Sequence, residues 1–187
     1  MKNRFSEENI EQNLKDCLSF IGEDVTREGL IETPKRIVKS WKELYAGYHQ
    51  DPEDILKTTF VEGSCKEMVV LKQIDFFSTC EHHFLPFFGS VDIGYIPDEK
   101  VVGLSKLARL VDIFSRRMQI QEKMTSQIAD TLMEVLKPKG CIVKVQAQHL
   151  CMLARGVKKA NATMVTSAIR GVFEKQEVRQ EFAELIK

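Results

Sequence analysis

The strongest constraint on the fold is a change in the spacing of apolar residues along the chain. Between 141 and 149, Val143, Val145 and Ala147 alternate with polar residues. A period of two is typical of a strand with one buried face. The same kind of signal is found at 67–77, 91–95 and 162–173. These segments predict two pairs of antiparallel strands, with the segment that contains Cys80 joining the first pair.

Helical spacing occupies the rest of the chain. Ser6 is placed to cap a first helix whose apolar face includes Cys17, and Thr33 is placed to cap a second helix with Pro34 in its first turn. Asp51 precedes a proline in the same way. Further helices are expected at 107–114, 120–136 and 178–186.

Strands grouped with strands and helices with helices, without βαβ alternation, indicate an α+β fold. We expect an antiparallel sheet with two helices on one side, an N-terminal helical extension and a C-terminal helix. No repeat or linker divides the chain, so we expect one domain over 1–187. Its N-terminal helices would occupy 1–60, and its core and last helix 61–187.

Charge and composition exclude several classes of protein. The chain has 27 basic and 27 acidic residues, whereas general nucleic-acid binding needs a basic excess. No apolar run approaches the roughly 20 residues of a membrane helix, and the first residues contain no apolar signal core. We therefore expect a cytoplasmic protein that binds neither nucleic acid nor membrane. Five cysteines without an export signal indicate thiols or metal ligands, not a disulfide framework.

Three of the four histidines lie in two short segments that also contain cysteine. Cys80 and His83 have the two-residue gap of a metal-ligand pair. If the strand that ends at His149 continues, His149 and Cys151 share the face of Val143. Thiolate and imidazole ligands suit zinc.

The number of ligands distinguishes two kinds of zinc site. Cys80, His83 and Cys151 make three ligands and leave a position for water, as in catalytic sites, with His82 and His149 free for proton transfer. On spacing alone, a closed structural site that includes His149 is a second possibility. Buried structural cysteines without metal are the third alternative.

Several ordered segments resemble the signatures of the GTP cyclohydrolase I family, and the resemblance extends from about Glu23 to Phe182. The most specific are Ser78-Thr79-Cys80-Glu81-His82-His83 and His149-Leu150-Cys151. The others are Gly103–Lys106, Arg109, Gln119–Glu122, Ala154–Gly156, Thr33–Arg36 and Val165–Ser167.

The resemblance implies a role for each matching residue near the metal. Cys80, His83 and Cys151 match the zinc ligands. His82 matches the histidine that protonates the imidazole ring of guanine, and His149 matches a second proton-transfer residue.

The resemblance also implies how GTP is held. Glu122 matches the carboxylate that accepts hydrogen bonds from guanine, Gln121 lies beside it in the base pocket, and Ser105 matches a hydroxyl near the ribose. The cations that match a triphosphate site are Lys106, Arg109, Arg155, Lys39 and, less closely, Arg36.

The implied reaction is hydrolysis of GTP at guanine C8, with loss of formate and closure to 7,8-dihydroneopterin triphosphate. The family has the tunnelling fold and forms decamers of two pentamers with active sites between subunits. The rival interpretations are a non-catalytic zinc protein of this fold, a zinc hydrolase acting on another purine or pterin, and a nitrile-reducing relative. A non-catalytic zinc protein would not require Glu122, Lys106, Arg109 and Arg155 together, so their presence disfavours it. The paired histidines of the zinc motif disfavour the nitrile-reducing relative.

Overall fold

The structure is a computed structural model that describes residues 5–62 and 65–187. It divides into two compact units, Met1–Ala46 and Gly47–Lys187. The expected single domain over 1–187 stays a prediction, and each unit is described by itself.

The first unit is helical. It contains α1 (Glu7–Phe20), α2 (Glu28–Ile31) and α3 (Thr33–Leu44), and Lys42 of α3 forms an ion pair of 2.7 Å with Glu7. The Ser6 hydroxyl accepts a hydrogen bond from the Asn9 N–H, which confirms the predicted cap.

Two details of this unit differ from the prediction. Glu32 occupies the cap position of α3, because the Thr33 hydroxyl instead donates to the Gly29 carbonyl. Cys17 is exposed and not part of a core, since the helix α1 contains no buried residue.

The second unit is built on a five-stranded sheet in the order β5-β2-β3-β6-β7. Its long strands pair antiparallel, while the two-residue β5 pairs parallel with the end of β2. The bounds are β2 (Val69–Cys80), β3 (Pro86–Ile96), β5 (Met118–Gln119), β6 (Gly140–His149) and β7 (Met164–Gly171). A separate pair consists of β1 (Thr59–Phe60) and β4 (Val101–Val102). The predicted mixed α and β architecture with an antiparallel sheet is confirmed.

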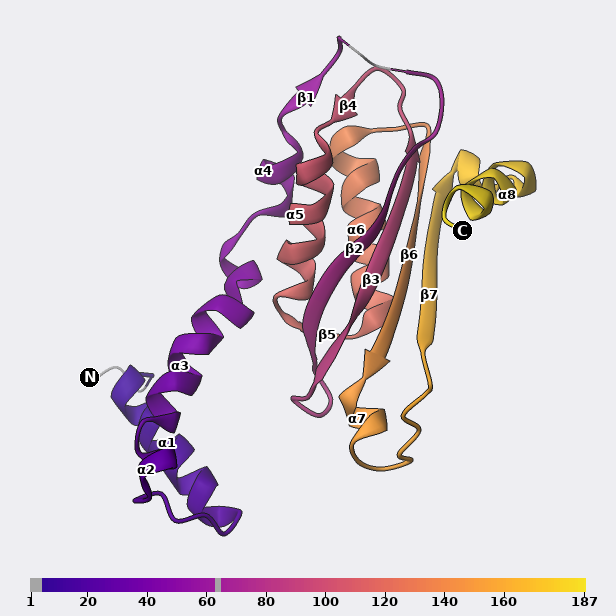
Figure 1. Ribbon diagram of the computed structural model, residues 1–187. Coiled ribbons are helices and arrows are strands. Elements are labelled where there is room, and N and C mark those ends of the chain that lie inside the picture. The colour runs from indigo at the N-terminus through magenta and orange to yellow at the C-terminus, as the bar shows by residue number, and fades with distance from the viewer. Residues whose placement is uncertain (1–4, 63–64) are drawn as a thin grey trace. The chain divides into compact units, whose positions relative to one another are not determined.

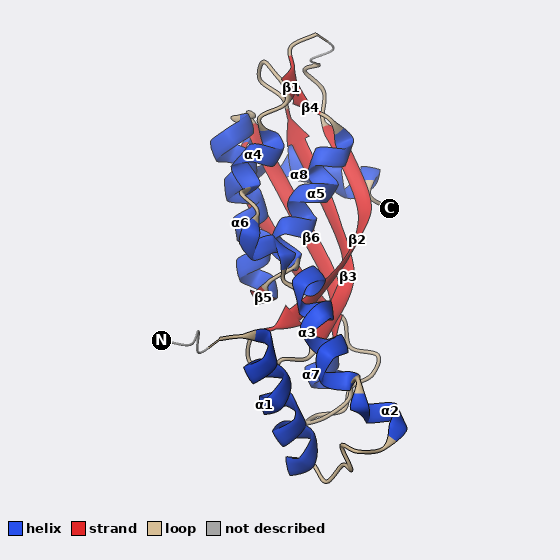
Figure 2. Ribbon diagram, turned by 90° about the vertical axis from the view of Figure 1, so that its left-hand side faces the viewer, coloured by secondary structure: helices blue, strands red, loops and turns tan. Residues whose placement is uncertain are grey.

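Two helices cover one face of the sheet (Figures 1 and 2). They are α5 (Leu104–Ser115) and α6 (Gln121–Thr131), which continues as a π-helical turn, η2 (Leu132–Leu136). The sheet and helix side chains that form the core include Val91, Ile93, Tyr95, Val143, Val145, Leu107, Leu110, Met124 and Ile128. This alternation along β3 and β6 is the period-two pattern of the sequence, and it puts odd-numbered residues of both strands toward the helices.

The opposite face is covered at one end by α8 (Gln176–Leu185). Phe182 packs with Ile142 and Phe173 in a second apolar cluster, and the Lys72 ammonium donates to the Leu185 carbonyl. The unit also contains three short helical segments, α4 (Pro52–Leu56), α7 (Leu150–Leu153) and η3 (Val172–Glu174). The segment η1 (Ala46–His49) spans the boundary between the two units. Asp51 caps α4 through its side chain, as predicted.

Candidate active site

A tight turn between β2 and β3 presents the first two candidate metal ligands. Cys80 is the last residue of β2, and its N–H donates to the Leu85 carbonyl at 2.8 Å. Its own carbonyl accepts from His83 at 3.4 Å and from Phe84 at 2.9 Å. These bonds curl the chain back so that the Cys80 Sγ lies 3.8 Å from the His83 Nδ1.

The third candidate ligand comes from a different element than the sequence predicts. The strand β6 ends at His149, and Cys151 lies in the helical turn α7, so the expected continuation of the strand through Cys151 is wrong. The helical turn nevertheless brings the thiol to the same place, because antiparallel pairing of Phe87 with His149 sets the start of α7 beside the β2–β3 turn. The candidate ligand atoms of Cys80, His83 and Cys151 all lie within 4.8 Å of one another.

The donor atoms of this cluster are consistent with a zinc site. Burial and then the neighbouring Cys80 raise the pKa of the Cys151 thiol. A bound divalent cation opposes this effect because it stabilises both thiolates. Two sulfur ligands and one imidazole fit zinc, and three protein ligands are the number found in catalytic sites.

His82 lies next to the cluster and is exposed. Its Nδ1 is 3.9 Å from the Cys80 Sγ, and its ring meets that of His83 edge to face at 6.2 Å. Its proton-transfer role stays a prediction, and its exposure leaves the imidazole accessible to a molecule beside the cluster.

His149 is held more tightly than His82. Its ring stacks on Phe87, with 4.6 Å between centroids and 3° between planes, and its Nε2 lies 2.7 Å from the Gln121 Oε1. Burial lowers the pKa of His149, and the charge of Glu122 partly opposes this. His149 shares the face of Val143, Val145 and Ala147, as predicted.

Phe87 is a site residue that the sequence interpretation missed. It is fully buried and pairs directly with His149. A signal was present, because Phe87, Gly89 and Val91 extend the alternation of 91–95 backwards. The predicted strand began at Val91, whereas β3 begins at Pro86.

Gln121 and Glu122 open α6 but point to different surroundings. The Gln121 side chain is only 1% exposed and bonds to protein groups. The expected place of Gln121 beside Glu122 in the base pocket stays a prediction. Glu122 is exposed in the first turn of the helix, where the helix dipole favours a negative charge. Its sequence neighbour Gln121 contacts His149, so the start of α6 lies beside this histidine.

The candidate cations and Ser105 are not all brought to the metal cluster. Arg155 is exposed in the turn that follows α7, so it lies at the metal end of the sheet. Ser105, Lys106 and Arg109 lie in the first half of α5. This helix begins after β4, and Figure 1 shows β4 at the opposite end of the sheet from α7.

The length of β3 separates the start of α5 from the candidate metal ligands. It runs 11 residues from Pro86, beside the metal turn, to Ile96, which corresponds to roughly 30 Å. Within one chain, therefore, Ser105 and Lys106 are remote from Cys80. Arg36 and Lys39 lie in α3 of the first unit, and their role stays a prediction.

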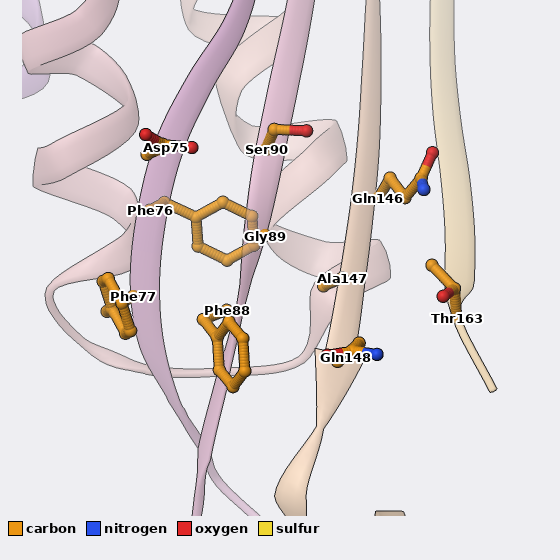
Figure 3. A pocket seen from close by; sticks show the side chains of 10 residues that line it. All are labelled: Asp75, Phe76, Phe77, Phe88, Gly89, Ser90, Gln146, Ala147, Gln148 and Thr163. Carbon is orange, nitrogen blue, oxygen red and sulfur yellow. The ribbon is translucent and has the colours of Figure 1, made fainter. Parts of the chain in front are cut away.

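A hollow of about 590 Å³ lies elsewhere, on the sheet face away from α5 and α6 (Figure 3). Phe77 and Phe88 stack there at 5.5 Å, and polar side chains such as Asp75 and Gln146 complete its lining. None of the predicted site residues lines this hollow.

Among the helices that the structure describes, none is long and apolar enough to cross a membrane.

Comparison with known proteins gives consistent matches over nearly the whole chain. A family model described as GTP cyclohydrolase I matches residues 10–187. The GTP cyclohydrolase 1 of Wolinella succinogenes is 63% identical over 174 residues, which cover 92% of this chain and 93% of that protein. The GTP cyclohydrolase 1 of Helicobacter pylori J99 is 54% identical over 179 residues, covering 95% and 99%.

One solved structure gives a much weaker likeness. The archaeosine synthase QueF-Like in the apo form aligns with a TM-score of 0.44 and 19% identity, over 56% of this chain and 93% of that chain. This likeness is too low to bear on the fold.

Proposed function

The chain belongs to the GTP cyclohydrolase I family, and we propose that the cluster at the end of its sheet opens the guanine ring of GTP at C8. The protein is an enzyme, a GTP cyclohydrolase I. The proposed products are formate and 7,8-dihydroneopterin triphosphate, the precursor of reduced pterins and tetrahydrofolate.

Zinc is the proposed cofactor, held by Cys80, His83 and Cys151. The donor set of this site supports that choice, because two thiolates and an imidazole within 4.8 Å of one another suit zinc. When bound, zinc lowers the pKa of a water molecule to about 7, so that hydroxide is available at neutral pH.

Proton transfer is proposed for the two histidines that do not bind metal. His82 donates a proton to the imidazole ring of guanine when water attacks C8, and the ring opens to a formamide. A second hydrolysis releases formate. His149, with Ser105 near the ribose, assists the rearrangement and the ring closure that follow. Positioned groups of this kind each contribute a factor of about 10² to 10⁴.

GTP binding is proposed to use Glu122 for the guanine N–H groups, with the Gln121 backbone beside it. A carboxylate matches this edge because it accepts two hydrogen bonds. A triphosphate carries several negative charges, and Lys and Arg side chains pair with them. The proposed triphosphate ligands are Lys106, Arg109, Arg155, Lys39 and Arg36.

The distance between the start of α5 and the cluster of metal ligands within one chain supports an oligomer. Ser105 and Lys106 lie at the far end of the sheet from the metal cluster, so one chain does not form a complete site. We propose that the site is completed only when the start of α5 comes from a second copy. This agrees with the assembly that the family implies, a decamer of two pentamers with the tunnelling fold and interface active sites. A cytoplasmic location is proposed with it.

The observation that carries the proposed function is the convergence of the cluster, His82, His149 and Glu122 at one end of the sheet. The test is to incubate zinc-loaded protein with GTP and follow pterin absorbance and formate together. We expect both products, and we expect chelation of zinc to abolish them and zinc addition to restore them. Cys151→Ser should lower turnover at least about 100-fold, whereas Cys17→Ser, an exposed thiol outside the cluster, should not.

Two results would contradict parts of the proposal. If zinc binds at one ion per chain and GTP remains unchanged, the chain is a non-catalytic zinc protein of this family. If turnover is equal on guanosine and GTP, the triphosphate ligands are assigned wrongly.

A further inference from the structure

A buried glutamine amide contacts the second proton-transfer histidine. Gln121 Nε2 lies 3.1 Å from the Val145 carbonyl and 3.2 Å from the Met164 carbonyl. On its other side, Gln121 Oε1 lies 2.7 Å from His149 Nε2. The side chain therefore links β6, β7 and His149 from inside the core.

The orientation of this amide is determined by its partners. Backbone carbonyls only accept hydrogen bonds, so the amide atom that faces Val145 and Met164 must be the NH₂ group. The opposite orientation would place the amide oxygen against two carbonyl oxygens, and no hydrogen bond could form between these acceptors.

Two threonines support the same assignment. The Thr125 hydroxyl donates to the Gln121 backbone carbonyl at 2.6 Å, so its proton is already used. The Thr166 hydroxyl, 2.7 Å from that of Thr125, must then donate to it. Thr166 Oγ1 is left as an acceptor for Gln121 Nε2 at 3.1 Å. All three partners of Gln121 Nε2 are thus acceptors, which agrees with an NH₂ group at this position.

The orientation of the Gln121 amide determines which ring nitrogen of His149 carries a proton. A glutamine Oε1 accepts only, so the imidazole nitrogen that faces it must carry a proton. In the neutral ring the other nitrogen, Nδ1, is then unprotonated. Stacking on Phe87 restrains the plane of the ring, and the bond to Gln121 restrains its rotation within that plane.

We propose that Gln121 is a positioning residue that holds His149 as the Nε2–H tautomer, so that His149 enters the reaction as a proton acceptor at Nδ1. The inference rests on the proposed proton-transfer role of His149. The two histidines then have different roles at the start of the reaction, because His82 begins as the proton donor and His149 as the acceptor. Gln121 acts through His149 and not through a side-chain contact with GTP.

The tautomer can be measured without any substitution. Uniform ¹⁵N labelling of histidine and solid-state NMR on the intact zinc-loaded protein separate protonated from unprotonated ring nitrogens. His→Gln variants at His49, His82 and His149 assign these three residues, and the remaining signals belong to His83. We expect the neutral His149 ring to show a proton on Nε2 and a bare Nδ1. A proton on Nδ1 would overturn the inference, whatever the activity of the protein.

A matched pair of variants tests the positioning role. Gln121→Met and Gln119→Met each remove a buried amide of the same segment, since Gln119 is 2% exposed and donates to the Phe114 carbonyl and to Gln127. Of these two glutamines, Gln121 is the one that contacts His149. We expect Gln121→Met to lower kcat about 10- to 100-fold, with KM changed less than about threefold, and the single His149 tautomer to become a mixture.

The control separates positioning from stability. Gln119→Met should leave kcat within about threefold and the His149 tautomer unchanged. Equal losses of kcat in both variants would show that Gln121 has only a structural role. If Gln121→Met does not fold, the wild-type tautomer still decides the inference. An Nε2–H tautomer in a protein that leaves GTP unchanged would instead refute the proposed function alone.

Discussion

At the scale of single residues, neighbouring positions of similar chemistry have different environments. His82 and His83 adjoin in the sequence, yet only His83 belongs to the group of possible metal ligands. Cys80 and Cys151 lie beside each other, whereas Cys141 is buried between β6 and α6 and its thiol donates to the Ala129 carbonyl at 3.5 Å. Residue type alone therefore does not identify the metal ligands.

The two adjacent histidines should separate metal binding from proton transfer. We expect His83→Ala to lose zinc and activity together. We expect His82→Ala to retain one zinc per chain and to lose about 10² to 10⁴ in kcat. Zinc content and turnover, measured on the same samples, check this. Unchanged turnover in His82→Ala would show that the assigned acid is wrong.

The buried Cys141 should be chemically inert. Burial raises its pKa to about 12, and the thiolate is the reactive form. Relative to a thiol at the ordinary value of 9.0, the thiolate fraction at pH 8 is about 10³-fold smaller. We expect alkylation of Cys141 at pH 8 to be slower by at least this factor in the native protein than in urea. Mass spectrometry of alkylated peptides measures both rates, and equal rates would contradict the burial.

At the scale of elements, the site depends on close contact between β3 and β6. A Cβ at Gly89 would lie 1.9 Å from the Gln146 carbonyl oxygen and 2.7 Å from the Ala147 Cα. Both neighbours are backbone atoms, so the strands would have to move apart. This contact lies two residues from Phe87, whose pairing with His149 sets the start of α7.

Gly89→Ala should therefore destabilise the fold strongly, by about 2–4 kcal/mol. Gly103→Ala is the matched control, because Gly103 has φ −61° and a Cβ there would meet only the Lys106 Cγ, at 3.9 Å. Urea unfolding of both variants measures the difference. Equal midpoints would show that the two strands separate at little cost.

At the scale of the whole molecule, the remote positions of Lys106 and Cys80 predict complementation between inactive chains. A Lys106→Ala chain retains the metal cluster, and a His82→Ala chain retains the start of α5. In mixed oligomers, a site that takes each part from a different chain has both parts intact in about a quarter of cases.

Co-expression of the two chains with different tags should thus restore about a quarter of wild-type turnover. Lys106→Ala mixed with Arg109→Ala is the control, since both substitutions damage the same helix and no site is complete. No recovery in the first mixture, with oligomers shown to contain both tags, would contradict a shared site.

Much of the architecture follows from local patterns. Period-two segments predicted β2, β3, β6 and β7, helical spacing predicted α1, α3, α5, α6 and α8, and Ser6 and Asp51 cap their helices as expected. These features depend on neighbours along the chain, whose side chains alternate or recur by backbone geometry alone. The motif of Cys80 to His83 and its resemblance to one family likewise belong to the sequence.

Other features depend on residues far apart in the sequence, and only the tertiary structure decided them. Cys151 reaches Cys80 from a helical turn and not from a strand, because the pairing of β3 with β6 positions α7. The Gln121 side chain is buried against β6 and β7 and contacts His149. Ser105 and Lys106 follow β4 to the far end of the sheet. A sequence specifies which side chains are available, whereas strand register and chain reversal determine which of them meet.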